Sequence, residues 1–309
     1  MSSKGIEEVK HSNSHPRIIA MVNGLRGSMG KEIAAACFRR GIRIAAISLS
    51  GRKGDDVYIR DGIVLDAEPS IESDLRVSLL PCDGNREDRV RSFQATLRPA
   101  EDILIAIDFT HPSAVNVNAE LYARLKIPFI MGTTGGNRDA LYEVTRASGV
   151  HAVIAANMCK QIVALQTMLE SMSNSFPNAF AGYALSVTES HQSHKADTSG
   201  TAKDMVRYFN ALRGGEPFPI ANITKHRDAA SQLSFGVPEN ALPGHAFHTY
   251  RLQSADNTVA FEFKHNVCGR VTYAEGTVDA LIFLAGRIAD RSEKRIFDMK
   301  DILRAGAMN

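Results

Sequence analysis

Residues 17–41 have the sequence RIIAMVNGLRGSMGKEIAAACFRRG, and this stretch decides the fold. It begins with a mainly apolar run, which predicts a buried strand, and continues through a turn that holds three glycines. It ends in an alanine-rich segment with helical spacing, closed by Gly41. The predicted order is strand, tight turn and helix, which is typical of the first unit of an α/β domain.

The three glycines of the turn follow a GxxGxxG spacing, at positions 24, 27 and 30. Residues without a side chain permit a tight turn and let a phosphate approach the backbone at the start of the helix. The spacing alone is also compatible with an ordinary turn, but its place after the first strand favours a dinucleotide site. The predicted cofactor contacts in this loop are Gly24, Leu25, Arg26, Gly27, Ser28 and Met29.

Strands and helices continue to alternate along the first half of the chain. We expect strands at residues 42–49, 102–109, 128–131 and 152–155 and helices at 112–125 and 137–148, with a polar insertion after residue 49. Alternation of this kind implies parallel strands joined by right-handed crossovers. The first half is therefore predicted to be a Rossmann-like, doubly wound α/β domain.

The second half of the chain has a different pattern. An apolar helix is expected at residues 161–176, then strands at 183–189, 246–252 and 258–265 that are predicted to be antiparallel. Helical spacing at 277–290 and a short segment at 297–304 predict a return to the first domain. The predicted parts are a tail (1–16), a dinucleotide-binding domain (17–157), an α+β domain for substrate binding and oligomerisation (158–276) and a C-terminal segment (277–309).

The end of the second predicted strand bears on the choice of cofactor. An acidic residue at this place usually binds the ribose hydroxyls of NAD, but here residues 48–53 are SLSGRK. Arg52 and Lys53 favour the 2′-phosphate of NADPH over NADH. A solvated basic loop is the alternative interpretation, and Asp55 and Asp56 lie close by.

Small polar residues and glycines also end two further strands. The sequence DFT occupies residues 108–110, and GTTGG occupies 132–136. Ligands bind at the carboxyl edge of such sheets, and residues of this kind let a flat ring approach the backbone, although each segment alone also fits ordinary turn chemistry. The expected cofactor contacts here are Phe109, Gly132, Thr133 and Thr134, with Phe109 along the nicotinamide.

The densest group of polar residues is ESHQSHKADTSGTA, residues 189–202, which leaves a predicted strand and enters a helix. His191 exchanges protons near neutral pH, and Lys195 can hold a carboxylate or, if partly desolvated, act as an acid. Residues 199–201 are expected at the helix N-terminus, where free amide groups suit a carboxylate. A surface loop with capping residues is the alternative, and for His194 alone a structural role is favoured.

Composition and charge argue against several other classes of protein. The chain has 309 residues, of which 44% are hydrophobic and 23% charged, and its net charge of +2 gives no reason to expect nucleic acid. Charged residues interrupt every apolar stretch, so we expect no membrane span. Residues 1–16 lack the composition of a signal or transit peptide, so a cytoplasmic location is expected.

Cysteines and histidines give no indication of a metal site. The four cysteines have neither zinc nor disulfide spacing and are expected to be reduced thiols. His245, His248 and His265 alternate with apolar residues in predicted strands, which favours core or cleft positions over metal binding. We therefore expect no metal.

Taken together, segments 22–30, 108–110, 132–135, 156–158, 189–202 and 297–301 resemble the dihydrodipicolinate reductase family. The resemblance covers nearly the whole chain from Arg17 onward, and the histidine, lysine and Ser-Gly-Thr element within 189–202 is its most specific part. The sequences GHAFH at 244–248 and AEGTVDA at 274–280 are more similar to the plant-type branch than to the common bacterial one.

This resemblance implies the NAD(P)H-dependent reduction of 4-hydroxy-tetrahydrodipicolinate, a small cyclic dicarboxylate, to tetrahydrodipicolinate on the path to diaminopimelate and lysine. It implies that His191 is the acid/base residue and that Lys195 is a proton donor or a carboxylate contact. Gly200 and Thr201 would bind a substrate carboxylate through backbone amides, and domain closure would bring the two halves together. Further cofactor contacts would come from Ala156, Asn157, Met158 and Cys159.

The chain departs from the family pattern at two places. Bacterial members commonly carry a second histidine directly after the catalytic one, and here that position is Gln192, which can bind a carboxylate but holds no titrating proton. The usual proline before Ser-Gly-Thr is absent. We expect Gln192 and Ser199 among the substrate contacts. A homo-oligomer is expected, either a tetramer as in bacterial members or a dimer.

Two other functions remain open from the sequence. The first domain alone would fit another two-domain NADP-dependent dehydrogenase, but acylation chemistry needs an activated cysteine, and Cys159 has no obvious paired histidine. A non-catalytic regulator that senses NADPH is the second alternative. Under this alternative the polar residues at 189–202 would have no function.

Overall fold

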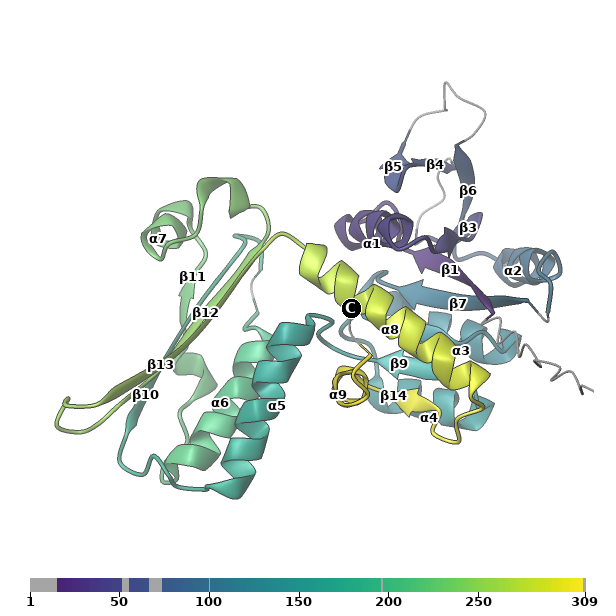
Figure 1. The fold of residues 1–309 in the computed structure, drawn as a ribbon. Helices are drawn as coiled ribbons and strands as arrows, with labels where there is room; N and C mark the ends of the chain where they lie inside the picture. The colour runs from purple at the N-terminus through teal and green to yellow at the C-terminus, as the bar shows by residue number, and fades with distance from the viewer. Residues whose placement is uncertain (1–15, 52–55, 67–73, 100, 196, 308–309) are drawn as a thin grey trace, which may run out of the picture.

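The computed structural model describes residues 16–51, 56–66, 74–99, 101–195 and 197–307. These residues form two domains that lie side by side, with one long helix running from the second domain across the first (Figure 1). The predicted cofactor contacts Arg52 and Lys53, like the tail up to residue 15, lie outside the described residues.

The first domain is built on a six-stranded parallel sheet with the strand order β14-β9-β8-β7-β1-β2. Its two longest strands, β1 and β7, pair over their full length, from Arg17 opposite Asp102 to Asn23 opposite Asp108. The strand bounds are β1 Arg17–Asn23, β2 Arg43–Ile44, β7 Asp102–Asp108, β8 Phe129–Met131, β9 Ala152–Ile154 and β14 Ile296–Phe297. The predicted doubly wound fold is confirmed, and the order reverses between β1 and β7, where such sheets bind ligands.

Helices cover both faces of this sheet. One core places α1 (Ser28–Arg39) and α8 (Val271–Ala289) against side chains such as Ile105 and Ile107. The other packs α3 (Val115–Leu125) and α4 (Arg138–Ser148) on the opposite face, with α2 (Arg86–Gln94) beside them. A short 3₁₀ turn, Pro112–Ala114, leads into α3. Because both faces are covered, the strands are apolar throughout rather than alternating.

The prediction of one second strand at residues 42–49 is wrong. The segment breaks into β2 and β3 (Ile47–Leu49), and β3 joins a separate four-stranded sheet with the order β3-β6-β4-β5. The other strands of that sheet are β4 Val57–Arg60, β5 Ile63–Leu65 and β6 Leu75–Leu80. Much of the expected polar insertion is therefore a small sheet, whose buried residues Val57, Ile59 and Val77 alternate with polar ones.

The second domain is a four-stranded sheet with two helices on one face. The strand order is β11-β10-β12-β13, antiparallel except for the parallel pair of β10 and β11. Helices α5 (Lys160–Ser175) and α6 (Gly200–Arg213) pack on it through a core that includes Leu169, Met205 and Phe209. The strands are β10 Ala184–His191, β11 Thr224–His226, β12 His245–Gln253 and β13 Ala260–Cys268, and the short helices are α7 Ala229–Ser234 and the 3₁₀ turns Ile220–Asn222 and Glu239–Ala241. This agrees with the predicted α+β domain.

The C-terminal segment returns to the first domain. Helix α8 begins at Val271, earlier than the predicted residue 277, directly after the last strand of the second domain. It packs along α1, and then β14 adds to the edge of the parallel sheet beside β9. Asp298 forms a capping box with Asp301 and starts α9 (Met299–Arg304). Among the described residues, no helix is long and apolar enough to cross a lipid bilayer.

Candidate active site

The glycine loop after β1 is packed so closely that side chains are excluded. A Cβ on Gly24, whose φ is +76°, would lie 2.6 Å from the carbonyl oxygen of Phe109, and one on Gly30 would lie 2.3 Å from the carbonyl oxygen of Gly24. Gly27 is the N-cap of α1, where no side chain caps the free amide groups and no acidic residue lies in the first turn. The loop can therefore offer its amides to an anion such as a pyrophosphate.

A cavity of about 610 Å³ lies beside this loop. Its walls include Leu25, Arg26 and Gly27 from the loop, and Ser50 and Gly51 from the end of β3. Four of the predicted cofactor contacts, Gly24, Leu25, Arg26 and Gly27, thus line this cavity. Ser28 does not line it.

Arg86 also lines this cavity, although no pattern in the sequence indicated this role. The side chain is buried and donates to the carbonyl oxygen of Ser50 at 2.8 Å and to Oδ1 of Asn118 at 3.0 Å. Asn118 in turn donates to Asp108 at 2.9 Å. Only the fold brings the first residue of α2 to the end of β3, so a charged residue inside a polar segment carried no signal.

Buried polar groups fix the sheet edge beneath the loop. Asp108 accepts hydrogen bonds from Tyr122 at 2.7 Å and from Asn118, and Asn23 donates to Tyr122 at 2.8 Å. Burial, with the Asp108 charge beside it, holds the pKa of Tyr122 well above its usual value, so the phenol keeps its proton. Thr133 belongs to this network because its hydroxyl donates to the carbonyl oxygen of Asp108. It lines neither the cavity beside the loop nor the second cavity described below.

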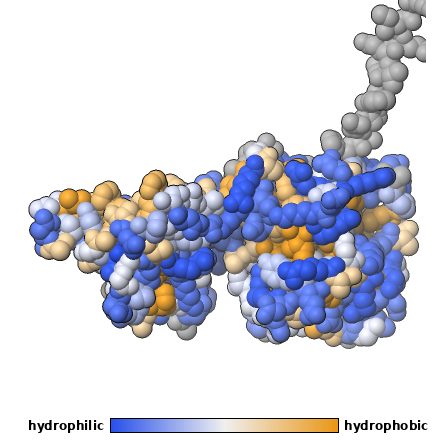
Figure 2. Space-filling model, turned by 90° about the horizontal axis from the view of Figure 1, so that it is seen from below, coloured by the Kyte–Doolittle hydropathy of each residue, from blue (hydrophilic) through white to orange (hydrophobic). Residues whose placement is uncertain are grey.

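A second cavity, of about 870 Å³, is formed by both domains, and the molecule is visibly hollowed between them (Figure 2). Phe109 lines both cavities and therefore marks where they meet. Its ring lies against Gly132, where a Cβ would be 2.2 Å from Phe109 Cζ. Several predicted cofactor and substrate contacts line this second cavity. They are Met29, Phe109, Gly132, Thr134, Ala156, Asn157 and Met158 from the first domain and Lys195, Ser199, Gly200 and Thr201 from the second.

Other predicted residues lie elsewhere. Cys159 is buried, with its Sγ 3.3 Å from Oγ1 of Thr272, and contributes to a different, smaller pocket. Gln192 and His191 are not among the residues that line the 870 Å³ cavity. The structure thus brings Lys195 and the start of α6 to the wall of the cavity but leaves His191 behind that wall.

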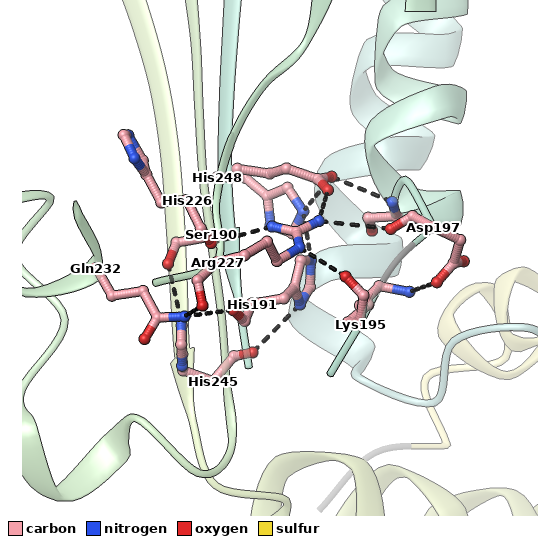
Figure 3. Close-up of polar contacts among 11 residues, drawn as sticks. Ser190, His191, Lys195, Asp197, His226, Arg227, Gln232, His245 and His248 are labelled. Atoms are coloured by element: carbon pink, nitrogen blue, oxygen red, sulfur yellow. Dashed lines mark hydrogen bonds and ion pairs between the residues drawn. The ribbon is translucent and has the colours of Figure 1, made fainter. Parts of the chain in front are cut away.

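His191 is buried, with 7% of its surface exposed, at the end of β10 (Figure 3). Its Nδ1 lies 3.2 Å from the carbonyl oxygen of His245, and its Nε2 lies 3.3 Å from Nε2 of His248. Burial, followed by the positive charges of Arg227 and Lys195, lowers the pKa of His191 to about 3. The imidazole is therefore neutral at physiological pH.

Lys195 and the start of α6 form one polar part of the cavity wall. Lys195 Nζ contacts Oδ1 of Asp197 at 2.7 Å, and this contact lowers the pKa of Asp197. Helix α6 begins after Ser199, with no side-chain cap and no acidic residue in its first turn. Asn157 donates to Oγ1 of Thr201 at 3.2 Å and links the first domain to this helix. A cation and free amides in one wall suit an anionic ligand.

Three residues outside the predicted set anchor this loop (Figure 3). Glu189 is fully buried and accepts hydrogen bonds from the amide of Ser199, at 3.1 Å, and from Arg227 Nη2. Arg227 also donates through Nε to the carbonyl oxygen of Lys195 at 2.8 Å. Gln232 donates to the carbonyl oxygen of His191 at 2.8 Å. Both ends of the loop are therefore tied to the segment after β11.

Glu189, His191 and His248 lie close enough to hold a metal ion, with one ligand atom of each within 4.8 Å of the others. Glu189 is already bound by the Arg227 cation, and the two imidazoles hydrogen-bond each other. A metal ion would have to displace both contacts and lie beside a guanidinium. We therefore assign no metal to this cluster.

Two family models match the chain in succession. The model for the N-terminus of dihydrodipicolinate reductase matches residues 18–158, and the model for its C-terminus matches residues 161–303. The chain belongs to the dihydrodipicolinate reductase family. This confirms the predicted resemblance and an oxidoreductase function.

Curated relatives and a solved structure agree with this membership. 4-Hydroxy-tetrahydrodipicolinate reductase 2, chloroplastic, of Arabidopsis thaliana is 46% identical over 94% of this chain and 78% of its own length. Reductase 1, chloroplastic, of the same plant is 42% identical over 100% of this chain and 84% of its own length. A dipicolinate-bound dihydrodipicolinate reductase from Paenisporosarcina sp. TG-14 has the same fold, with a TM-score of 0.57 at 18% identity over 92% of this chain and 97% of its own.

These relatives overturn the expected cytoplasmic location. The two Arabidopsis enzymes and two probable reductases from Oryza sativa subsp. japonica are all named chloroplastic. The expectation rested on the composition of residues 1–16 alone. The compartment of a protein is set by targeting signals and not by its catalytic fold. The composition of so short a segment was therefore weak evidence for a location.

Proposed function

We propose that the protein catalyses the NADPH-dependent reduction of 4-hydroxy-tetrahydrodipicolinate to tetrahydrodipicolinate in the biosynthesis of diaminopimelate and lysine. Family membership and the names of the plant relatives support this reaction. The observation that carries it is the cavity between the domains, in which Lys195 and the free amides of α6 share a wall with Phe109 and Gly132. A dicarboxylate ring needs this combination of cation and amides.

Substrate binding falls to the second domain in this proposal. Gly200 and Thr201 offer backbone amides to one carboxylate, and Lys195 lies in the same wall. Ser199 lines the same cavity while Glu189 holds its backbone amide, and it is proposed as a further substrate contact. Gln192, at the start of the loop, does not line the cavity and stays a prediction. A charge-assisted contact at each carboxylate fixes the ring in the cavity.

The 4-hydroxyl group of the substrate must leave as water, and the ring then needs a hydride and a proton. The nicotinamide, when bound, supplies hydride to a ring carbon of the substrate. Negative charge then develops on the substrate, and Lys195, at the cavity wall, is placed to donate a proton. His191 is the second residue assigned to the reaction; because its ring is neutral and does not line the cavity, we propose that it supports the loop that carries Lys195 and does not itself donate the proton.

NADPH is the proposed cofactor. The end of β3 carries Ser50 and Gly51 where NAD-specific domains usually place an acidic side chain, and the buried Arg86 lies in the same wall. Arg26 lines it as well. Cations beside the ribose would stabilise a 2′-phosphate. Arg52 and Lys53 stay predictions.

We also propose a plastid location and a homo-oligomer. The chloroplastic names of the four plant relatives support the location. Strand β13 lies at an edge of its sheet, and Phe261 in this strand and Val259 directly before it are exposed, so a second subunit could cover them. Size-exclusion chromatography with light scattering distinguishes monomer, dimer and tetramer.

A coupled assay tests the reaction. Dihydrodipicolinate synthase generates the substrate from pyruvate and aspartate semialdehyde, and NADPH absorbance is followed after this protein is added. NADPH oxidation that requires the coupling enzyme supports the proposal, and a parallel assay with NADH measures the preference. Folded protein that binds NADPH but does not oxidise it would contradict the proposal and favour the sensor.

A further inference from the structure

Both ring nitrogens of His191 have a hydrogen-bond partner (Figure 3). A carbonyl oxygen only accepts, so the contact with the carbonyl of His245 requires the proton of the neutral His191 ring to be on Nδ1. Nε2 of His191 is then an acceptor. The proton between the two rings therefore belongs to Nε2 of His248.

His248 meets the complementary condition. Its Nδ1 is buried and has no hydrogen-bond partner among the described residues, which suits a bare nitrogen better than an N–H, because an unpaired buried donor is the more costly group. Burial, followed by the neighbouring His265 and His191, holds the pKa of His248 well below its usual value. The ring is therefore neutral and carries its proton on Nε2.

Charged groups connect the His191–His248 pair to the cavity wall at the start of α6. Glu189 stands opposite His248 in the strand register, and its Oε2 lies 3.8 Å from His248 Nε2. The same oxygen accepts the amide of Ser199 at the start of α6. Arg227 and Lys195 are the cations that face the pair, and the other titratable neighbours are His245 and His265.

We propose that His248 is a positioning residue of the reaction: its Nε2–H donates to Nε2 of His191 and holds that ring in one tautomer and one orientation. The proposal rests on the role proposed above for His191. Strand β12 thereby supplies a second imidazole to His191, whose neighbour in the sequence, Gln192, has none.

Two substitutions of His248 separate the hydrogen bond from the volume of the ring. His248→Gln can place an amide N–H near the position of Nε2, whereas His248→Leu fills the space without a donor. His265→Phe is the matched control, because this ring stacks on His248 at 4.6 Å between centroids and its nitrogens have no hydrogen-bond partner in the described part of the chain.

The readouts are ¹⁵N NMR of labelled histidines and steady-state kinetics. The wild type is expected to show His191 as the Nδ1–H tautomer. In His248→Leu the freed lone pair raises the pKa of His191, and kcat falls by about tenfold to a hundredfold with the KM for NADPH unchanged. His248→Gln and His265→Phe keep the His191 tautomer and most of kcat.

Several results would overturn the proposal. An Nε2–H tautomer of His191 in the wild type would do so, as would a leucine variant with unchanged kcat and an unchanged His191 signal. If the leucine variant does not fold, the glutamine variant decides. Loss of the His191 Nδ1–H signal in a folded His248→Gln variant would also overturn the proposal. Absence of reductase activity in the wild type would instead refute the proposed function, and the NMR experiment would still decide the role of His248.

Discussion

Lys195 and His191 belong to one loop but lie in different environments. Lys195 reaches the cavity wall, where Asp197 is its partner, whereas His191 turns into the sheet and stays neutral. A cation at the wall can bind a carboxylate or release a proton, and a neutral imidazole behind it can shape the site without contacting solvent. Lys195 is therefore the residue placed to donate the proton, whereas His191 supports the loop that carries Lys195.

The first prediction concerns these two side chains. Lys195→Ala and His191→Ala are each expected to lower kcat by about a hundredfold or more while NADPH binding stays nearly intact, because both act on the substrate side of the cavity. Lys225→Ala, at an exposed lysine of β11, is the control. Turnover in the coupled assay and NADPH titration by fluorescence measure the two effects, and unchanged turnover in both variants would remove the assignment.

The second prediction concerns Arg227. Arg227→Met leaves the buried carboxylate of Glu189 without its cation and frees the carbonyl of Lys195, so we expect a stability loss of about 3–5 kcal/mol and a large fall in kcat. Arg207→Met, at an exposed arginine of α6, is expected to change stability by less than about 0.5 kcal/mol. Urea unfolding of both variants checks this, and equal losses would show that the ion pair has no special role.

The composition of the 189–202 loop indicated a site, but its anchors could not be predicted. Arg227 lies 38 positions from Glu189 along the chain, and His248 lies 57 positions from His191. These contacts exist only because β10 pairs with β11 and β12, and no local pattern encodes that register. The sequence therefore indicated several residues that line the cavities and missed those that hold them.

At the scale of the elements, strands β10, β12 and β13 of the second domain carry several neutral histidines, and three of these, His191, His248 and His265, lie next to one another. Burial lowers the pKa of His191 to about 3 and that of His265 to about 4, and it holds that of His248 well below 6.5. The unfolded chain takes up protons at these groups below pH 6.5, while the folded chain does not. The contribution of these histidines to the free energy of unfolding is thus fully present above pH 6.5 and is lost as the pH falls toward 4.

The third prediction follows from these strands. The melting temperature of the protein is expected to fall between pH 6.5 and pH 4, and His265→Phe is expected to make that fall shallower, because one of the three groups is removed. Differential scanning fluorimetry across this range measures the slope. An identical slope in the variant would show that other groups cause the acid sensitivity.

Regular elements were predicted well where their pattern is strong. Strands β1 and β7 are continuous apolar runs, and α1 has clear apolar periodicity, so their bounds differ from prediction by one residue at most. The small sheet of β3 to β6 was missed because its strands are only three to six residues long, and β4 and β6 also carry a charged side chain. Short strands of this kind depend on tertiary pairing rather than on propensity.

At the scale of the whole molecule, the two domains are connected twice, through the segment before α5 and through α8. The two connections touch where Gly276 of α8 passes the carbonyl oxygen of Met158, at which a Cβ would come within 1.8 Å. Only glycine allows this crossing. The contact therefore fixes how the second domain joins the first.

The fourth prediction tests this crossing. Gly276→Ala is expected to destabilise the protein by about 1–3 kcal/mol, because the methyl group forces α8 away from the Met158 backbone. Gly286→Ala, in the same helix with open space at its Cβ, is expected to be neutral or to stabilise by up to about 1 kcal/mol. Chemical unfolding compares the pair, and similar values for both would show that the crossing can relax.

The late position of β14 has a consequence for how the protein is made. This strand, Ile296–Phe297, completes the parallel sheet beside β9, yet the whole second domain is synthesised between the two. The second domain can therefore fold on the ribosome while the first still presents an open sheet edge and lacks the cover of α8. A nascent chain in this state is a natural client for a chaperone, and truncations that remove β14 would lower the solubility of the protein.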